Sequence, residues 1–139
     1  MVLGKKHNQN DYEWGRKQEK KITPYLREHF QSNLVNSSSQ YAKWDYTGDG
    51  YKMEMKSRKF AYEKYDTTYL SEDKLKDADN NTYYLFNFVY NTHDDLSDLY
   101  FIKYDKEKFA TFKKKELQYS YSLIEIPCKD LNHIVMEVI

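Results

Sequence analysis

Three residues near the middle of the chain have the types and the spacing that metal-assisted phosphodiester hydrolysis requires. Asp45 precedes a glycine-containing turn, and Glu54 and Lys56 follow that turn two residues apart. Two carboxylates can share one divalent cation such as Mg²⁺ or Mn²⁺, which keeps its remaining positions for water and phosphate oxygens. A lysine ammonium beside them can position the attacking water, help to deprotonate it and offset phosphate charge. The trio therefore predicts a divalent-metal site that hydrolyses phosphodiester bonds.

A β-hairpin is the element that we expect to bring these side chains together. Residues 41–46 and 51–57 form two predicted strands that flank Thr47-Gly48-Asp49-Gly50, a sequence typical of a tight turn. Side chains alternate between the two faces of a strand. The charged residues of the second strand therefore share one face and its apolar residues the other: Lys52, Glu54, Lys56 and Arg58 against Tyr51, Met53 and Met55.

The register of this hairpin decides whether the two acids meet. If Thr47 pairs with Gly50, Asp45 faces Lys52 and Glu54 lies diagonally from Asp45, close enough for both carboxylates to reach one ion. The same placement also permits a simpler interpretation, in which Asp45 and Lys52 form an ordinary cross-strand ion pair on a solvated face. Both interpretations remain open from the sequence.

The Glu-x-Lys pattern alone is weak, because the chain contains it at Glu19, Glu54 and Glu72. Only Glu54 lies on an alternating strand after a glycine turn, with an acid placed on the same face of the preceding strand. This context selects the middle tripeptide.

A first helix is predicted over residues 11–30. Its inward stripe at spacings of three and four comprises Gly15, Glu19, Ile22, Leu26 and Phe30. Glu19 therefore faces the interior, where an unpaired carboxylate is costly. Pro24 is expected to kink the helix, or to begin a second short helix capped by Thr23.

The rest of the chain predicts one further helix and several strands. Because helices and strands are mixed along the chain, the fold class is α+β or a mixed α/β sandwich. The predicted elements are a helix over residues 71–79, a central strand over 83–90, and strands over 99–104, 119–126 and 133–139.

The segment from Asp45 to Lys56 resembles the split motif of the PD-(D/E)xK nuclease superfamily, in which an acid ends one strand and an acid-x-lysine lies on the next. Here eight residues separate Asp45 from Glu54-Met55-Lys56. The resemblance implies a restriction-endonuclease-like αβββαβ core over about residues 11–90, with a central mixed sheet flanked by helices. Residues 91–139 would add C-terminal strands to that sheet. Trp44 stands where the family has a proline, and no first strand is evident before residue 41.

The resemblance also implies roles for individual residues. Asp45 and Glu54 would hold the metal, and Lys56 would be the catalytic lysine. Glu19 matches the first-helix glutamate that many members add to the metal site. Arg58, and Lys52 on the same charged face, would contact nucleic acid.

Size and composition fit one intracellular domain spanning residues 1–139. The chain has 40% hydrophobic residues and no apolar run of membrane-spanning length, so we expect a cytoplasmic protein without a membrane partner. Cys128 is its one cysteine, which excludes an intramolecular disulfide. A net charge of zero argues against broad nucleic-acid affinity, although basic residues outnumber acids over 1–30 and 103–116.

Other kinds of site have less support. The four histidines, His7, His29, His93 and His133, are scattered without metal-ligand spacing. An acidic loop containing Asp94, Asp95 and Asp98 lacks the alternating ligands of an EF-hand. The sequence has no glycine-rich phosphate loop.

The sequence thus predicts a metal-dependent endonuclease or exonuclease acting on DNA, with RNA as a substrate and a homodimer left open. The alternative is a non-catalytic accessory protein of viral or mobile-element origin that binds nucleic acid or protein. The two differ in one testable property, because the accessory protein would not bind Mg²⁺ or Mn²⁺.

Overall fold

The computed structural model describes residues 9–37, 39, 41–117 and 121–137. This part of the chain is α+β, as the sequence predicts, and contains a mixed six-stranded sheet, an antiparallel three-stranded sheet and two α-helices. With η denoting a 3-10 helix, its elements are α1 (Gln9–His29), β1 (Val35–Asn36), β2 (Tyr46–Gly48), β3 (Tyr51–Arg58), η2 (Tyr62–Lys64), β4 (Thr67–Ser71), η3 (Glu72–Leu75), β5 (Thr82–Asn91), β6 (Leu96–Lys103), α2 (Lys106–Ala110), β7 (Lys113–Leu117), β8 (Tyr121–Pro127), η5 (Cys128–Asp130) and β9 (Asn132–Ile134).

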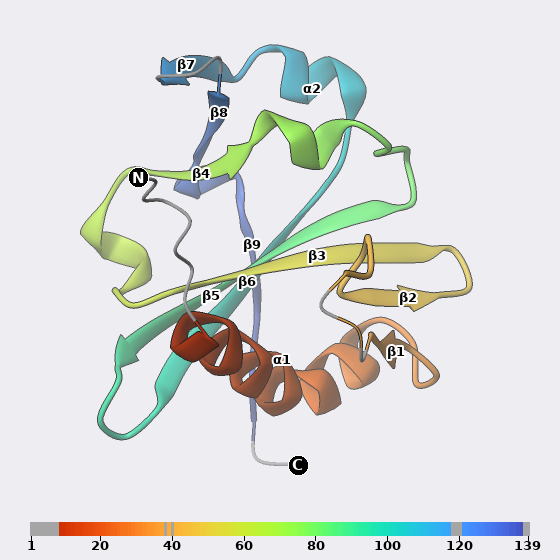
Figure 1. The fold of residues 1–139 in the computed structure, drawn as a ribbon, viewed down its shortest axis with the longest axis vertical. Coiled ribbons are helices and arrows are strands. Elements are labelled where there is room, and N and C mark those ends of the chain that lie inside the picture. The colour runs from red at the N-terminus through yellow and green to blue at the C-terminus, as the bar shows by residue number, and fades with distance from the viewer. Residues whose placement is uncertain (1–8, 38, 40, 118–120, 138–139) are drawn as a thin grey trace.

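The two sheets and α1 are arranged in layers around the large sheet, whose strand order is β1-β2-β3-β5-β6-β9. Figure 1 shows α1 along one side of this sheet and the small sheet, β4-β8-β7, together with α2 on the other side. The resemblance implied helices flanking this sheet; on the second side, the small sheet covers it together with α2. No helix in the described residues is long and apolar enough to cross a membrane.

β5 is the central strand, as predicted, and both of its faces are buried. Tyr84, Phe86 and Phe88 belong to the core beneath the small sheet, whereas Leu85 belongs to the core beneath α1. The strand pairs in parallel with β3 and antiparallel with β6. Since a fully buried aromatic or aliphatic side chain contributes roughly 1.5–3 kcal/mol, this strand anchors both cores.

α1 continues through Pro24 without a second helix, so the predicted break is wrong. Proline cannot donate the hydrogen bond to the carbonyl four residues earlier. The Pro24 ring is exposed, which leaves that carbonyl open to water. On the opposite side of α1, Ile22 and Leu26 are fully buried and Glu19 is 9% exposed. These three positions of the predicted inward stripe are therefore confirmed.

The connection between β3 and β5 differs most from expectation. Instead of a helix over residues 71–79 it contains η2, β4 and η3, and β4 pairs with β8 in the small sheet. The Ser71 hydroxyl accepts a hydrogen bond from the Asp73 N–H and caps one short turn. The Asp- and Asn-rich residues 77–81 then favour turns over a longer helix.

Residues beyond β5 divide between the two sheets, whereas we expected them only to extend the first. β6 and β9 extend the large sheet, and β7 and β8 build the small one with β4. The predicted strands over 99–104, 119–126 and 133–139 correspond to β6, β8 and β9, with residues 119, 120, 138 and 139 outside the described part. The sequence analysis missed α2 and β7.

The hairpin is present, but its predicted register is wrong by two residues. Thr47 lies opposite Lys52, and Gly48 opposite Tyr51, so that Asp49 and Gly50 alone form the turn. Gly50 has φ of 78°, a conformation that favours glycine. The loop still has two residues but lies one position further along the chain, which moves the partner of every residue in the first strand two positions along the second strand.

Candidate active site

Asp45 lies where β2 and β3 separate. The ladder between these strands ends at the pair Tyr46 and Met53, and β3 continues beyond it with β5 on its other side. The backbone N–H of Asp45 still donates to the Met53 carbonyl at 2.9 Å, and its carboxylate Oδ2 accepts the Met55 N–H at 2.8 Å. The side chain therefore takes the acceptor position that a neighbouring strand would fill, and is held against the second half of β3.

Glu54 is 5% exposed and contacts two lysines. Its Oε2 atom lies 3.2 Å from Lys56 Nζ and 3.2 Å from Lys74 Nζ. Lys56 was predicted from the motif, whereas Lys74 comes from η3 and was missed. Its tripeptide, beginning at Glu72, was set aside because it does not lie on a predicted alternating strand after a glycine turn.

Glu19 reaches the same region from α1. Its Oε1 atom accepts hydrogen bonds from Arg16 Nη1 at 2.6 Å and from Asn36 Nδ2 at 3.0 Å. Asn36 Nδ2 also lies 2.9 Å from the Asp45 carbonyl oxygen. Asn36, in β1, thus joins the helix to the backbone at Asp45, and the structure brings Glu19 near the motif residues as predicted.

The three carboxylates interact electrostatically. The pKa of Asp45 is raised from 3.8 to about 7, first by burial and then by the charges of Glu54 and Glu19, against the lowering effects of the Met55 N–H and Lys56. Burial and two neighbouring negative charges thus disfavour the ionised form of this carboxyl group. Asp45 is therefore a position where a bound cation would favour the ionised form.

The donor set suits a hard divalent cation, because all candidate ligands are carboxylate oxygens. Among the described residues, no group of three or more His, Cys, Asp or Glu side chains is spaced to hold a metal ion. Glu54 and Glu19 instead contact lysine, arginine and asparagine donors. The charges of Asp45 and Glu54 interact, which makes these two residues the candidate ligands, since Mg²⁺ commonly takes one or two carboxylates and keeps several waters. Glu19 could join only by leaving Arg16 and Asn36.

The two predicted nucleic-acid contacts lie in different surroundings. Lys52 pairs with Asp79 at 2.9 Å, in place of the cross-strand pair with Asp45 that the sequence left open. Arg58 Nη2 donates to the Tyr69 carbonyl at 2.6 Å, and burial lowers the pKa of its guanidinium. Arg58 therefore spans from β3 to β4, while Lys52 is tied to the loop that precedes β5.

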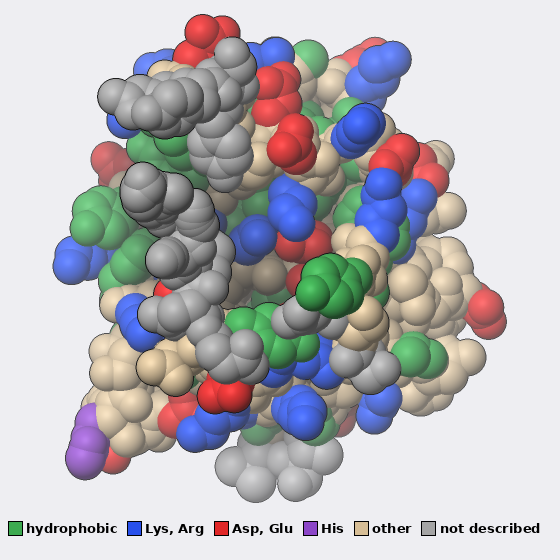
Figure 2. Space-filling view, viewed as in Figure 1, with side chains coloured by type: hydrophobic (Ala, Val, Ile, Leu, Met, Phe, Trp, Pro, Cys, Tyr) green, Lys and Arg blue, Asp and Glu red, His purple; other side chains and the backbone are tan. Residues whose placement is uncertain are grey.

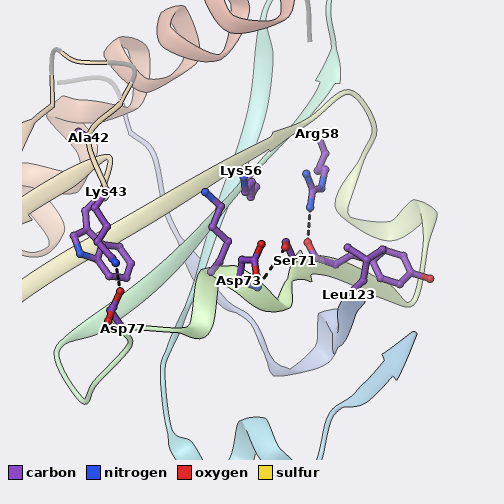
Figure 3. Close-up of a pocket in the computed structure, with 11 residues that line it drawn as sticks. Ala42, Lys43, Lys56, Arg58, Ser71, Asp73, Asp77 and Leu123 are labelled. Carbon is purple, nitrogen blue, oxygen red and sulfur yellow. Dashed lines mark hydrogen bonds and ion pairs between the residues drawn. The ribbon is translucent and has the colours of Figure 1, made fainter. Parts of the chain in front are cut away.

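A pocket of about 610 Å³ opens beside Lys56, between the uncovered edge of β3 and the connection to β5. Figure 3 shows Arg58 reaching from β3 toward β4, with the Lys43–Asp77 ion pair at one end of the pocket and Leu123 at the other. Its lining residues are Ala42, Lys43, Trp44, Lys56, Arg58, Tyr69, Ser71, Asp73, Lys74, Asp77 and Leu123.

Hydrogen bonds to α1 hold the acidic loop between β5 and β6. Asp95 Oδ1 accepts hydrogen bonds from Gln18 at 2.7 Å and from Lys21 at 3.2 Å, and the residue has φ of 56°. These bonds fasten the turn to α1, in agreement with the sequence-based choice of a turn over a calcium loop.

Charge on the surface is interspersed. Figure 2 shows Lys and Arg side chains alternating with Asp and Glu side chains across the face that contains the hairpin.

Comparison of the chain with family models, with curated proteins and with solved structures finds no match.

Proposed function

We propose that this protein is a divalent-metal-dependent nuclease of the PD-(D/E)xK kind that hydrolyses DNA phosphodiester bonds, with Mg²⁺ or Mn²⁺ as its cofactor. The observation that carries the proposal is the convergence of Asp45, Glu54 and Lys56 at the second half of β3. A buried pair of carboxylates, one with a pKa of about 7, lies there beside an ammonium group and a pocket.

The order of the elements supports the same proposal. α1, β1, β2, β3, a connection and β5 follow one another, and β3 and β5 are parallel. This order matches the αβββαβ core that the sequence resemblance implies, except that two 3-10 turns and β4 stand in place of the second helix. The restriction-endonuclease-like fold is part of the proposal on this ground.

The residues divide the chemistry between them. Asp45 and Glu54 would hold the ion, and Glu19 would assist from α1. A bound divalent ion would polarise a phosphate oxygen and lower the pKa of a bound water. Lys56 places an ammonium beside the carboxylates, where it offsets the negative charge that grows on the phosphate in the transition state. Arg58 and Lys52 would contact the DNA backbone.

Cleavage of DNA by conservative variants tests this proposal. Asp45→Asn, Glu54→Gln and Lys56→Met should each lower cleavage of labelled single- or double-stranded DNA at least about 100-fold, because each removes a group that stabilises the transition state. The matched control is Glu63→Gln, an exposed carboxylate on η2 that should retain activity. Circular dichroism checks that every variant folds.

Metal binding provides the second readout. Mn²⁺ titration by calorimetry should give a binding isotherm for the wild-type protein and none for Glu54→Gln. A wild-type protein that cuts no DNA with Mg²⁺ or Mn²⁺ would refute the nuclease. If it also binds no Mn²⁺, the non-catalytic accessory protein becomes the better description.

A further inference from the structure

The pocket beside Lys56 contains more positive than negative charge. Its lining includes four basic residues, Lys43, Lys56, Arg58 and Lys74, and two acidic ones, Asp73 and Asp77. Asp77 is already paired with Lys43. The three remaining basic side chains come from β3 and η3 and line the same pocket.

Glu54 and Asp73 neutralise only part of this charge and leave one positive charge over. One carboxylate oxygen of Glu54 serves both Lys56 and Lys74, each at 3.2 Å, so two ammonium groups share one negative charge. Arg58 donates to a backbone carbonyl, the oxygen of Tyr69, which has no formal charge. A phosphate group supplies the missing charge and is a natural acceptor for guanidinium and ammonium donors.

An aromatic side chain lines the same pocket. Trp44 is half-buried, and Lys52 Nζ lies 5.6 Å from its ring centroid. Proteins that bind unpaired strands combine a basic channel with aromatic rings on which bases stack, each worth roughly 1–3 kcal/mol. A volume of about 610 Å³ falls within the range of roughly 300–1,000 Å³ for pockets that enclose a small molecule, which suits one nucleotide and excludes a duplex.

We infer that this pocket binds one unpaired nucleotide of a DNA strand, with its phosphate between Arg58 and Lys74 and its base against Trp44. The inference rests on the proposed nuclease function and deepens it, because the strand would then pass Lys56 and the carboxylate pair. The substrate class is DNA with unpaired nucleotides, such as a single strand or a frayed end.

Trp44 itself reports on this binding. The chain has two tryptophans, so Trp14→Phe leaves Trp44 as the fluorophore. In EDTA, where no metal supports cleavage, an eight-residue thymidine oligonucleotide should quench this fluorescence saturably. A blunt duplex should not quench it, and an abasic strand of the same length should bind without quenching because it offers phosphates but no bases.

Lys74→Met, added to that background, should weaken oligonucleotide binding about tenfold. Lys76→Met is the matched control, because Lys76 is exposed two residues along and does not line the pocket. It should change the affinity less than twofold. Thermal melting confirms that both variants fold.

The outcomes separate this inference from the nuclease proposal. Saturable quenching that depends on Lys74 supports the pocket even if DNA is never cut. Cleavage that requires Asp45, together with Trp44 fluorescence that does not respond to the oligonucleotide, overturns the pocket and leaves the nuclease. Equal losses in the two lysine variants, or equal quenching by the abasic strand, also overturn it.

Discussion

Asp45 carries its carboxyl group in a buried position near Glu54 and Glu19, and this placement gives the folded protein a distinct pH dependence. Its pKa is about 7 in the folded chain against an ordinary value of 3.8. Between these two values the folded state holds a proton that the unfolded state has released. The contribution of this group to the free energy of unfolding therefore falls as pH rises from about 4 to 7, and the full penalty is present above pH 7.

Asp45→Asn should consequently stabilise the protein at pH 8 in EDTA. The asparagine carbonyl can still accept the Met55 N–H, while the charge is gone. A pKa difference of about three corresponds to at most ~4 kcal/mol. Urea unfolding at pH 4, 6 and 8 measures the effect, and Asp49→Asn in the exposed turn is the control. Parallel stability curves for wild type and Asp45→Asn would contradict the raised pKa.

At the scale of elements, one buried phenol fastens the hairpin to α1. Tyr46 is fully buried, and its hydroxyl donates to the Glu19 carbonyl at 2.7 Å and lies 3.2 Å from the Thr23 hydroxyl. These contacts hold the first helix beside Asp45. The Glu19 carbonyl, in the turn of α1 that precedes Pro24, thus accepts a hydrogen bond from outside the helix.

Tyr46→Phe should lower the free energy of unfolding by about 1–2 kcal/mol, because it removes one buried hydrogen bond and leaves the cavity filled. Tyr41→Phe is the matched control at a side chain that is 86% exposed, and it should change stability by less than about 0.5 kcal/mol. Urea denaturation of both variants gives the comparison. A similar loss for the two would mean that the buried phenol has no special role.

The elements that the sequence predicts well are those with a complete local pattern. The stripe through Ile22 and Leu26 locates α1, and the aromatic run from Tyr83 locates β5. The glycine turn locates the hairpin and therefore the motif. Its register depends on whether Gly48-Asp49 or Asp49-Gly50 forms the two-residue loop, which composition alone does not decide.

The missed elements depend on contacts between distant segments. β4 becomes a strand by pairing with β8, more than 50 residues further along the chain. Lys74 reaches Glu54 only because that pairing folds the connection back toward β3. Neither partner can be inferred from local periodicity, and so Lys74 was absent from the predicted site.

At the scale of the whole molecule, the zero net charge limits how DNA can be held. On the face shown in Figure 2 acidic and basic side chains are interspersed, and the pocket is one place where a strand would meet several basic side chains. Each phosphate contact on a single strand contributes about −0.7 to the slope of log K against log salt concentration. A strand held by few phosphate contacts therefore has a binding constant that depends only weakly on salt concentration.

We therefore expect a slope between about −0.7 and −1.4 for oligonucleotide binding in EDTA, since Arg58 and Lys74 would neutralise one or two phosphates. Fluorescence anisotropy at 50 to 300 mM salt measures it, and Lys74→Met should make it shallower by about 0.7. A slope steeper than about −4 would indicate that lysines elsewhere, such as those on β7, carry the binding.

The sharing of Glu54 by two lysines has a consequence for how metal and DNA would bind in the proposed nuclease. An ion that drew this carboxylate toward Asp45 would loosen Lys56 and Lys74 together, and both would become available to a phosphate. By thermodynamic reciprocity, a strand that engages the lysines first would tighten the hold on the ion by the same factor. Through the single side chain of Glu54, binding of the metal ion and binding of the DNA strand would thus be cooperative without any movement of the backbone.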